Sequence, residues 1–124
     1  MSAEERNVFG EPIERCSYDP LTGFFRNGHC WAGDQGAARH LVCIEATAEF
    51  LAFSKSRGND LSTPRPEFAF PGLNPGDRWC IVAERWREAF EAGKAPRVYL
   101  KSTHEYMLDL VPFAELKRFA LDLS

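Results

Sequence analysis

The residues best able to carry chemistry in this chain are its cysteines and histidines, which are dispersed rather than grouped. They are Cys16, Cys30, Cys43, Cys80, His29, His40 and His104. No Cys-x-x-Cys pair occurs, so the usual sequence signal for a zinc ribbon or a thioredoxin-like redox centre is missing. A zinc site built from Cys16, Cys30 and a histidine remains open, because zinc accepts mixed nitrogen and sulfur ligands. The histidine would be His29, next to Cys30, or His40.

Two of these residues are candidates for a catalytic group. Cys80 is expected near the start of a helix, where thiol pKa values fall, so it is a candidate reactive thiolate. Its neighbour Trp79 favours the alternative that Cys80 packs in the core. His104 follows Thr103 after the end of a predicted strand and is a candidate general base. The alternative is a helix-capping or surface histidine. Cys43, in an apolar run, is interpreted as a small buried hydrophobic residue.

A second group of polar residues lies in a proline-rich segment from Gly58 to Cys80. Its candidate ligand-binding residues are Asn59, Asp60, Ser62, Thr63, Arg65, Asp77, Arg78 and Trp79. Arg65 stands between two prolines that hold its backbone extended, so its guanidinium can present a fixed fork to a carboxylate or phosphate. The alternative for Arg65 is an internal salt bridge to Asp60 or Asp77. Turn formation alone could explain Asn59, Asp60, Ser62 and Thr63.

The string GNDLSTPRPEFAFPGLNPGDRWC, from Gly58 to Cys80, resembles the signature of DUF2237, a family of small, mostly bacterial proteins with no assigned function. Two flanking strings agree, NVFGEPIERCSYDPLTG and FLAFSKSRG. The resemblance extends from about Asn7 to Phe119 and implies no particular activity. The family pattern has Cys-Cys where this chain has His29-Cys30, and often a further cysteine at the position of Val82. The first departure keeps metal ligation open at position 29 but removes disulfide exchange there.

The elements that must position these residues can be predicted from hydrophobic periodicity. The run Leu41-Val42-Cys43-Ile44 predicts a buried strand, and Thr47 to Arg57 predicts a helix. A shared helical face of apolar residues predicts a second helix from about Arg78 to Ala92, with Asp77 as its N-cap. A strand at Trp79 to Val82 is the rival prediction.

Further elements are expected at both ends of the chain. Gly23 to Arg26 predicts a short strand, and Arg97 to Lys101 predicts a longer one. A helical turn over His104 to Leu110, opened by a capping box of Ser102 and Glu105, precedes a final helix that starts near Pro112.

An internal similarity relates Val42–Leu51 to Val98–Met107, each a strand followed by a helix start. If the two strands were parallel neighbours, Thr47, Thr103 and His104 would share one sheet edge, where ligands bind in α/β folds. The alternative is the ordinary sequence pattern of helix starts.

Composition and charge limit the partners. The net charge of −3 comes from 15 basic and 18 acidic residues that are interspersed, without the basic block expected for nucleic acid or an anionic membrane surface. No signal peptide is expected, and no apolar run approaches the ~20 residues of a membrane span. The expected compartment is the cytoplasm, where the four cysteines would be free thiols, metal ligands or a redox pair rather than structural disulfides.

These patterns predict a single α+β (or small α/β) domain over residues 7–124, after a flexible tail at residues 1–6. The expected architecture is a short sheet of about three to four strands, three to four helices and a long proline-rich loop. The preferred function is binding of a small anionic ligand or a peptide terminus on the Gly58–Arg78 loop. The alternatives are a thiol- or zinc-dependent protein using Cys16, Cys30 and Cys80, and a protein-interaction subunit. No cofactor is predicted beyond that zinc, and the oligomeric state is left open.

Overall fold

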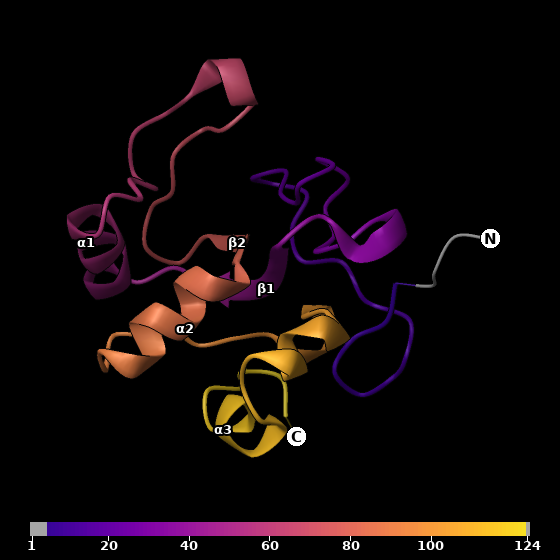
Figure 1. The fold of residues 1–124 in the computed structure, drawn as a ribbon. Coiled ribbons are helices and arrows are strands. Elements are labelled where there is room, and N and C mark those ends of the chain that lie inside the picture. The colour runs from indigo at the N-terminus through magenta and orange to yellow at the C-terminus, as the bar shows by residue number, and fades with distance from the viewer. Residues whose placement is uncertain (1–4, 124) are drawn as a thin grey trace.

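The computed structural model describes residues 5–123. Within them, the regular elements are a two-stranded antiparallel sheet, three α-helices and several short 3₁₀-helices, joined by long turns and loops (Figure 1). The predicted sheet of three to four strands is therefore wrong. Of the predicted tail at 1–6, residues 1–4 lie outside the described part, and Glu5 and Arg6 make defined contacts.

The sheet pairs β1 (His40–Glu45) with β2 (Arg78–Val82) at the centre of the molecule. Strand β1 is the predicted apolar run, and its four inner residues are buried. Cys43 lies directly opposite Cys80 in the register, and Ile44 lies opposite Trp79. Directly opposed residues point to the same face of a sheet, so the two cysteines share one face.

Helix α1 (Ala48–Ser56) is the helix predicted from Thr47 to Arg57. The Thr47 hydroxyl accepts a hydrogen bond from the amide of Phe50 at 3.0 Å, which caps the first turn. Helix α2 (Ala83–Glu91) follows β2 without a loop. The segment Arg78–Val82 is thus the rival strand rather than helix, and the predicted Asp77 N-cap is wrong because the Asp77 carboxylate closes a turn on the Asn74 amide.

The segment predicted as a strand at Arg97 to Lys101 forms only isolated bridges, and a 3₁₀-helix occupies Leu100–Ser102. Its bridge from Val98 to Ile44 is antiparallel. The hypothesis of parallel neighbours is therefore wrong, and Thr47 and His104 lie toward opposite ends of β1. The predicted capping box is also absent, because the Ser102 hydroxyl donates to the Arg15 carbonyl instead.

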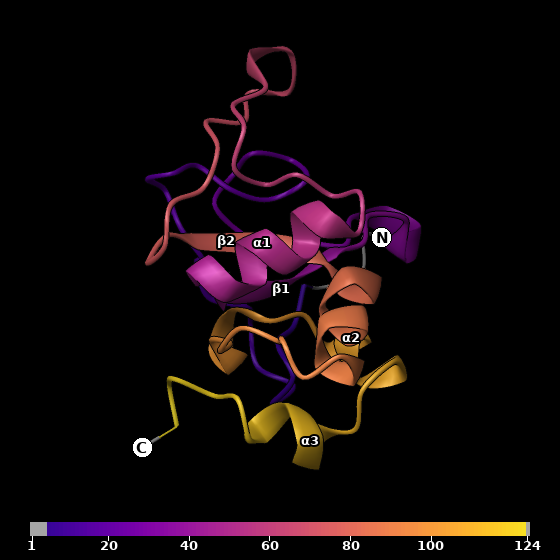
Figure 2. The same ribbon diagram turned by 90° about the vertical axis from the view of Figure 1, so that its left-hand side faces the viewer.

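His104 is the N-cap of a 3₁₀-helix at Glu105–Asp109, where its Nδ1 accepts from the amide of Tyr106 at 3.1 Å. This is the capping alternative considered for His104. The last helix, α3 (Phe113–Lys117), begins directly after Pro112 as predicted but is short. It lies at the opposite end of the molecule from the proline-rich loop (Figure 2).

The main core gathers around Trp86 on α2, which is fully buried. Its indole stacks on Phe90 and meets Phe119 edge-on, each at a centroid distance of 5.4 Å. Its Nε1 donates to the Pro96 carbonyl. Trp86 thus packs the chain that follows α2 and the C-terminal segment against one aromatic cluster. Burial of this apolar surface stabilises the fold by several kcal/mol.

The four cysteines form two buried disulfides, Cys16–Cys43 and Cys30–Cys80, with Cα–Cα distances of 5.7 and 5.4 Å. The prediction of free thiols is therefore wrong. Pairing of β1 with β2 places Cys43 and Cys80 on one face, and the N-terminal loops bring a partner to each. The predicted cytoplasmic location was based on the expectation of reduced thiols. Disulfides are more typical of oxidising compartments, so the cytoplasmic location stays a prediction.

No helix in the described part of the chain is long and apolar enough to cross a bilayer.

The loop between α1 and β2 projects from the body in both views (Figures 1 and 2). Its two legs are joined by backbone hydrogen bonds, from Arg65 N to Phe70 O at 2.8 Å and from Leu73 N to Leu61 O at 2.8 Å. A 3₁₀-helix at Pro66–Phe68 forms the tip. The legs touch at Gly72, where an added Cβ would lie 2.6 Å from the Ser62 carbonyl oxygen. The loop is therefore an ordered, hairpin-like projection.

Candidate functional site

A pocket of about 400 Å³ lies where the projecting loop meets the body. We call it the Arg65 pocket, after the side chain at its rim. Its walls come from an N-terminal turn, the first residue of β1, the loop and β2. The lining residues are Phe24, Arg26, His40, Asn59, Asp60, Leu61, Arg65, Phe68, Phe70 and Trp79.

Arg26 holds the loop tip against the N-terminal turn. Its guanidinium donates to the carbonyls of Phe68 at 2.8 Å and Ala69 at 3.3 Å. It also lies over the Trp79 ring, 5.2 Å from the centroid, where a cation–π contact adds attraction. Burial lowers the pKa of Arg26, but an arginine still stays charged at neutral pH. Because the turn around Arg26 is irregular, the strand predicted at Gly23 to Arg26 is wrong.

Arg65 is exposed, and its guanidinium has no hydrogen-bond or ion-pair partner among residues 5–123. The alternative of an internal salt bridge is thus not realised. The Asp60 carboxylate instead accepts from the Thr63 hydroxyl at 2.7 Å and from the Ser62 amide at 2.9 Å, and these bonds lower its pKa. Asp77 is engaged with the Asn74 amide. Arg65 therefore keeps its bidentate donor fork available to a ligand.

His40 supplies a second unsatisfied polar group. Its Nδ1 is buried and has no hydrogen-bond partner among the described residues, which is uncommon for a buried polar atom. Burial, and secondarily the charge of Arg26, lower the pKa of His40. The imidazole is therefore neutral at pH 7, and its free nitrogen can donate to or accept from a ligand according to the tautomer.

Aromatic rings form the apolar part of the Arg65 pocket. Phe70 meets Trp79 edge-on at 5.2 Å, and Phe24 lies 5.8 Å from the His40 ring. At the mouth, Phe24 is 56% exposed and Phe68 is 67% exposed. Exposed rings of this size beside cationic groups suit a ligand that has both an anionic head and an apolar body.

The structure divides the predicted ligand-binding residues into two groups. Asn59, Asp60, Arg65 and Trp79 line the pocket. The others lie elsewhere: Ser62 and Thr63 form the Asp60 turn, Asp77 closes the Asn74 turn, and Arg78 stacks 3.8 Å over the Tyr99 ring. No local pattern links residues 24–40 to the loop. The sequence therefore gives no signal that Phe24 and Arg26 belong to this pocket, and it suggests His40 only as a zinc ligand.

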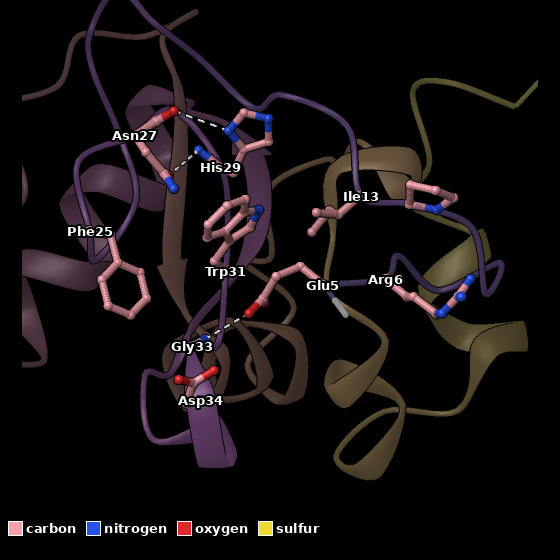
Figure 3. Close-up of a pocket in the computed structure, with 10 residues that line it drawn as sticks. Glu5, Arg6, Ile13, Phe25, Asn27, His29, Trp31, Gly33 and Asp34 are labelled. Atoms are coloured by element: carbon pink, nitrogen blue, oxygen red, sulfur yellow. Dashed lines mark hydrogen bonds between the residues drawn. The ribbon is translucent and has the colours of Figure 1, made fainter. Parts of the chain in front are cut away.

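A larger pocket of about 770 Å³ lies near the N-terminus, with Phe25, His29 and Trp31 on its wall (Figure 3). Two of its polar side chains, Glu5 and His29, already have partners. The Glu5 carboxylate accepts from the amides of Ala32 and Gly33 at 2.7 and 3.1 Å, and His29 Nδ1 lies 3.0 Å from the Asn27 carbonyl. The Glu5 and His29 atoms that make these bonds are therefore not available to a ligand.

The predicted catalytic and metal residues do not meet at either pocket as a functional set. Cys80 is bonded to Cys30, and His104 is buried with its Nε2 3.1 Å from a Glu5 oxygen. Burial lowers the pKa of His104, although the Glu5 carboxylate opposes that shift. His29 faces the larger pocket, whereas Cys16 and Cys30 lie in a buried cysteine cluster. His29, Cys16 and Cys30 are thus not arranged as one ligand set.

Comparison with known families gives one match over nearly the whole chain. The model of the family described as "Uncharacterized protein conserved in bacteria (DUF2237)" matches residues 6–120. No curated protein matches the chain.

Proposed function

The chain belongs to the DUF2237 family, and from that premise we propose that it is a binding protein for a small anionic ligand, held in the Arg65 pocket. The ligand has a carboxylate or phosphate head and an apolar, planar body. Arg65 binds the head through its fork, His40 contributes one further hydrogen bond, and the aromatic rings enclose the body.

The observation that carries the proposal is a pair of unsatisfied polar groups in one aromatic-walled pocket. The Arg65 guanidinium has no partner, and His40 Nδ1 is buried without one, among residues 5–123. A ligand that satisfies both would recover the desolvation cost of the histidine nitrogen. The clamped charge of Arg26 adds attraction for an anion without moving.

Binding is favoured over catalysis by the kinds of residue in the pocket. The lining residues provide two arginines, an imidazole, an amide, apolar surface and the Asp60 carboxylate, which is engaged with Ser62 and Thr63, but no cysteine, serine or threonine. Nucleophilic catalysis generally needs such a side chain beside an activating base. Asn59, whose side-chain amide has no partner within the described chain, gives the rim a neutral donor and acceptor instead.

A thermal-shift screen with small aromatic carboxylates and phosphates tests the proposal. A binding compound at about 100 times its dissociation constant should add about 2.7 kcal/mol to the free energy of unfolding. Arg65→Ala should abolish this stabilisation while leaving the unliganded melting temperature nearly unchanged, because the Arg65 guanidinium makes no internal hydrogen bond.

The matched control is Arg87→Ala, which removes an exposed arginine paired with Glu91 on α2. That variant should bind the same compounds with unchanged affinity. Equal binding by the wild type and Arg65→Ala, or no binding by any compound in the screen, would reject the proposal.

A peptide carboxyl terminus is a second candidate ligand, favoured by the exposed Phe24 and Phe68 rings beside the pocket. These rings could contact side chains that precede the terminal carboxylate. A peptide with a free carboxyl terminus should then bind more tightly than the same peptide with an amidated terminus. Equal affinities would exclude terminal recognition and leave only the small-anion form of the proposal.

A further inference from the structure

We propose that the four cysteines form a zinc-binding tetrathiolate centre when both disulfides are reduced. The disulfide-bonded chain and the zinc-bound chain would then be two redox states of one fold. This inference is independent of the proposed ligand binding. Trp79 lines the Arg65 pocket and Cys80 belongs to the cysteine cluster, and adjacent residues on a strand face opposite sides of the sheet.

The sulfur atoms of the cysteine cluster lie close together. The Sγ atoms of Cys16, Cys30 and Cys80 all lie within 4.8 Å of one another. The Sγ atom of Cys43 lies outside that group, but its bond to Cys16 keeps it beside one member. In a tetrahedral site with Zn–S bonds of about 2.3 Å, neighbouring sulfurs are roughly 3.8 Å apart. After reduction, the sulfurs of Cys16, Cys30 and Cys80 would need shifts of only about 1 Å to reach ligand distance. The Cys43 sulfur, released from Cys16, would turn toward the same point as the fourth ligand.

The backbone already holds the four cysteines in one buried cluster. Cys43 and Cys80 are paired across β1 and β2, so the sheet fixes two of the four sulfurs at neighbouring positions. Cys16 is held by a hydrogen bond of 2.7 Å from its amide to the Gly28 carbonyl. All four side chains are at most 2% exposed, so a bound metal would be shielded from water like a closed structural zinc site.

A cationic side chain lies beside the cysteine cluster. Zinc with four thiolates carries a net charge of −2, which is costly to bury without a nearby cation. Arg78 lies two residues before Cys80 on β2 and thus on the same face of the sheet. It stacks 3.8 Å over Tyr99, a residue packed against the cysteine cluster, and its Nε is buried with no hydrogen-bond partner among the described residues. Arg78 is therefore placed to compensate the charge of the centre.

The chemistry balances with a dithiol or phosphine as reductant. Reduction of each disulfide takes up two electrons and two protons, breaks one S–S bond and leaves two thiols, while the reductant is oxidised. Binding of one Zn²⁺ then displaces the four thiol protons. Tight binding should accordingly weaken as the pH falls.

The test begins with the full chain reduced by a phosphine, freed of excess reductant and mixed with zinc. We expect one zinc per chain after desalting and four thiols protected from alkylation, whereas the oxidised chain should retain none. Cobalt in place of zinc should give thiolate-to-cobalt charge-transfer absorption and the visible bands of a tetrahedral site. A reduced, folded chain with four reactive thiols and no bound metal would overturn the proposal.

Variants check the ligand set. Cys16→Ser and Cys80→Ser should each lower zinc affinity and alter the cobalt spectrum, and Arg78→Gln should lower zinc affinity about tenfold or more while keeping the tetrathiolate spectrum. His29→Ala is the control and should bind zinc as the wild type does. Loss of zinc from His29→Ala, or unchanged binding in Cys16→Ser, would contradict the four-cysteine site.

If the reduced chain unfolds without metal, refolding by zinc tests the proposal instead. Zinc should then restore the near-ultraviolet circular dichroism of the folded protein, because metal binding would supply the folding free energy that the disulfides supplied. Failure to refold with excess zinc would overturn the proposal.

Discussion

Two histidines in this protein are held neutral by burial. His40 lies at the Arg65 pocket, and His104 caps a 3₁₀-helix while its Nε2 lies near Glu5. Burial is the largest cause of the lowered pKa in both cases. Protonation of either group is thus easier in the unfolded chain than in the folded one.

This difference predicts acid sensitivity. In the unfolded chain both groups titrate near about 6.5, so the stability they contribute is present above that pH and is lost as the pH falls toward their folded pKa values. Protonation of each histidine would lower the free energy of unfolding by about 1.4 kcal/mol for every unit by which its folded pKa lies below its unfolded pKa. Denaturant unfolding at a series of pH values between 8 and 5 measures the loss.

The comparison variant for this prediction is His104→Gln, whose amide cannot titrate. Its stability should fall less steeply with decreasing pH than that of the wild type. Identical slopes in the two proteins would show that His104 does not contribute.

At the scale of elements, the projecting loop depends on glycine where its legs touch. Gly72 and Gly76 both have positive φ, at +79° and +96°, but only at Gly72 would a Cβ meet another leg of the loop. The two positions therefore separate backbone strain from close approach.

Gly72→Ala should destabilise the protein by more than Gly76→Ala does. Each variant incurs the strain of a left-handed backbone, about 1–3 kcal/mol, and Gly72→Ala must also push the Ser62 carbonyl away. Unfolding in denaturant measures both variants. Equal losses of stability would mean that the legs can separate freely, and the Arg65 pocket would then be less preorganised than proposed.

Ala69 gives the opposite prediction at the loop tip. Its φ of +53° is left-handed, which an alanine adopts at a cost. Ala69→Gly should therefore stabilise the protein by about 1 kcal/mol, because glycine adopts this conformation without strain. The hydrogen bond from Arg26 is kept, because its acceptor is the backbone carbonyl of residue 69. A destabilised variant in thermal unfolding would contradict the strain argument.

The elements that could be predicted from sequence are those whose apolar pattern is local. Strand β1 and helix α1 follow from an apolar run and a capping threonine. The segment from Arg78 to Val82 is harder to predict, because Trp79, Ala83 and Trp86 fit one face of a helix. In the structure Trp79 lies on strand β2 and is buried there. Pairing with β1 overrides that pattern, and such pairing is not visible in a local window.

The candidate site was predictable only in part. The loop signals identified Arg65 and Asn59, but Arg26 and His40 reach the pocket through tertiary contacts alone. The disulfides could not be assigned because four cysteines allow three pairings, and the assumed reducing compartment excluded them in advance. The residue types of the loop therefore indicate a site, but the residues that complete the site can be identified only from the folded structure.

At the scale of the whole molecule, the disulfides hold an N-terminal region that has almost no regular secondary structure. Their sequence separations are 27 and 50 residues. Loop-closure entropy gives about 3.5 kcal/mol for the shorter disulfide and about 4 kcal/mol for the longer one. The two contributions are not independent, because their loops overlap.

Replacing Cys16 and Cys43 together by alanine should thus lower the free energy of unfolding by about 3 kcal/mol under non-reducing conditions. Guanidinium unfolding monitored by tryptophan fluorescence measures the change, and the pair Cys30→Ala with Cys80→Ala should cost as much or more. A loss below about 1 kcal/mol would indicate that the unfolded chain is already compact.

The overlap of the two disulfide loops determines what a protease would produce from this protein. A cut between Cys16 and Cys43 leaves its pieces joined by the first disulfide, and a cut between Cys30 and Cys80, which includes the exposed loop, leaves them joined by the second. Every single cut from position 16 to position 80 therefore yields one covalent molecule with a broken backbone. Such a nicked protein would migrate as one species in a denaturing gel until a reductant separated it into two.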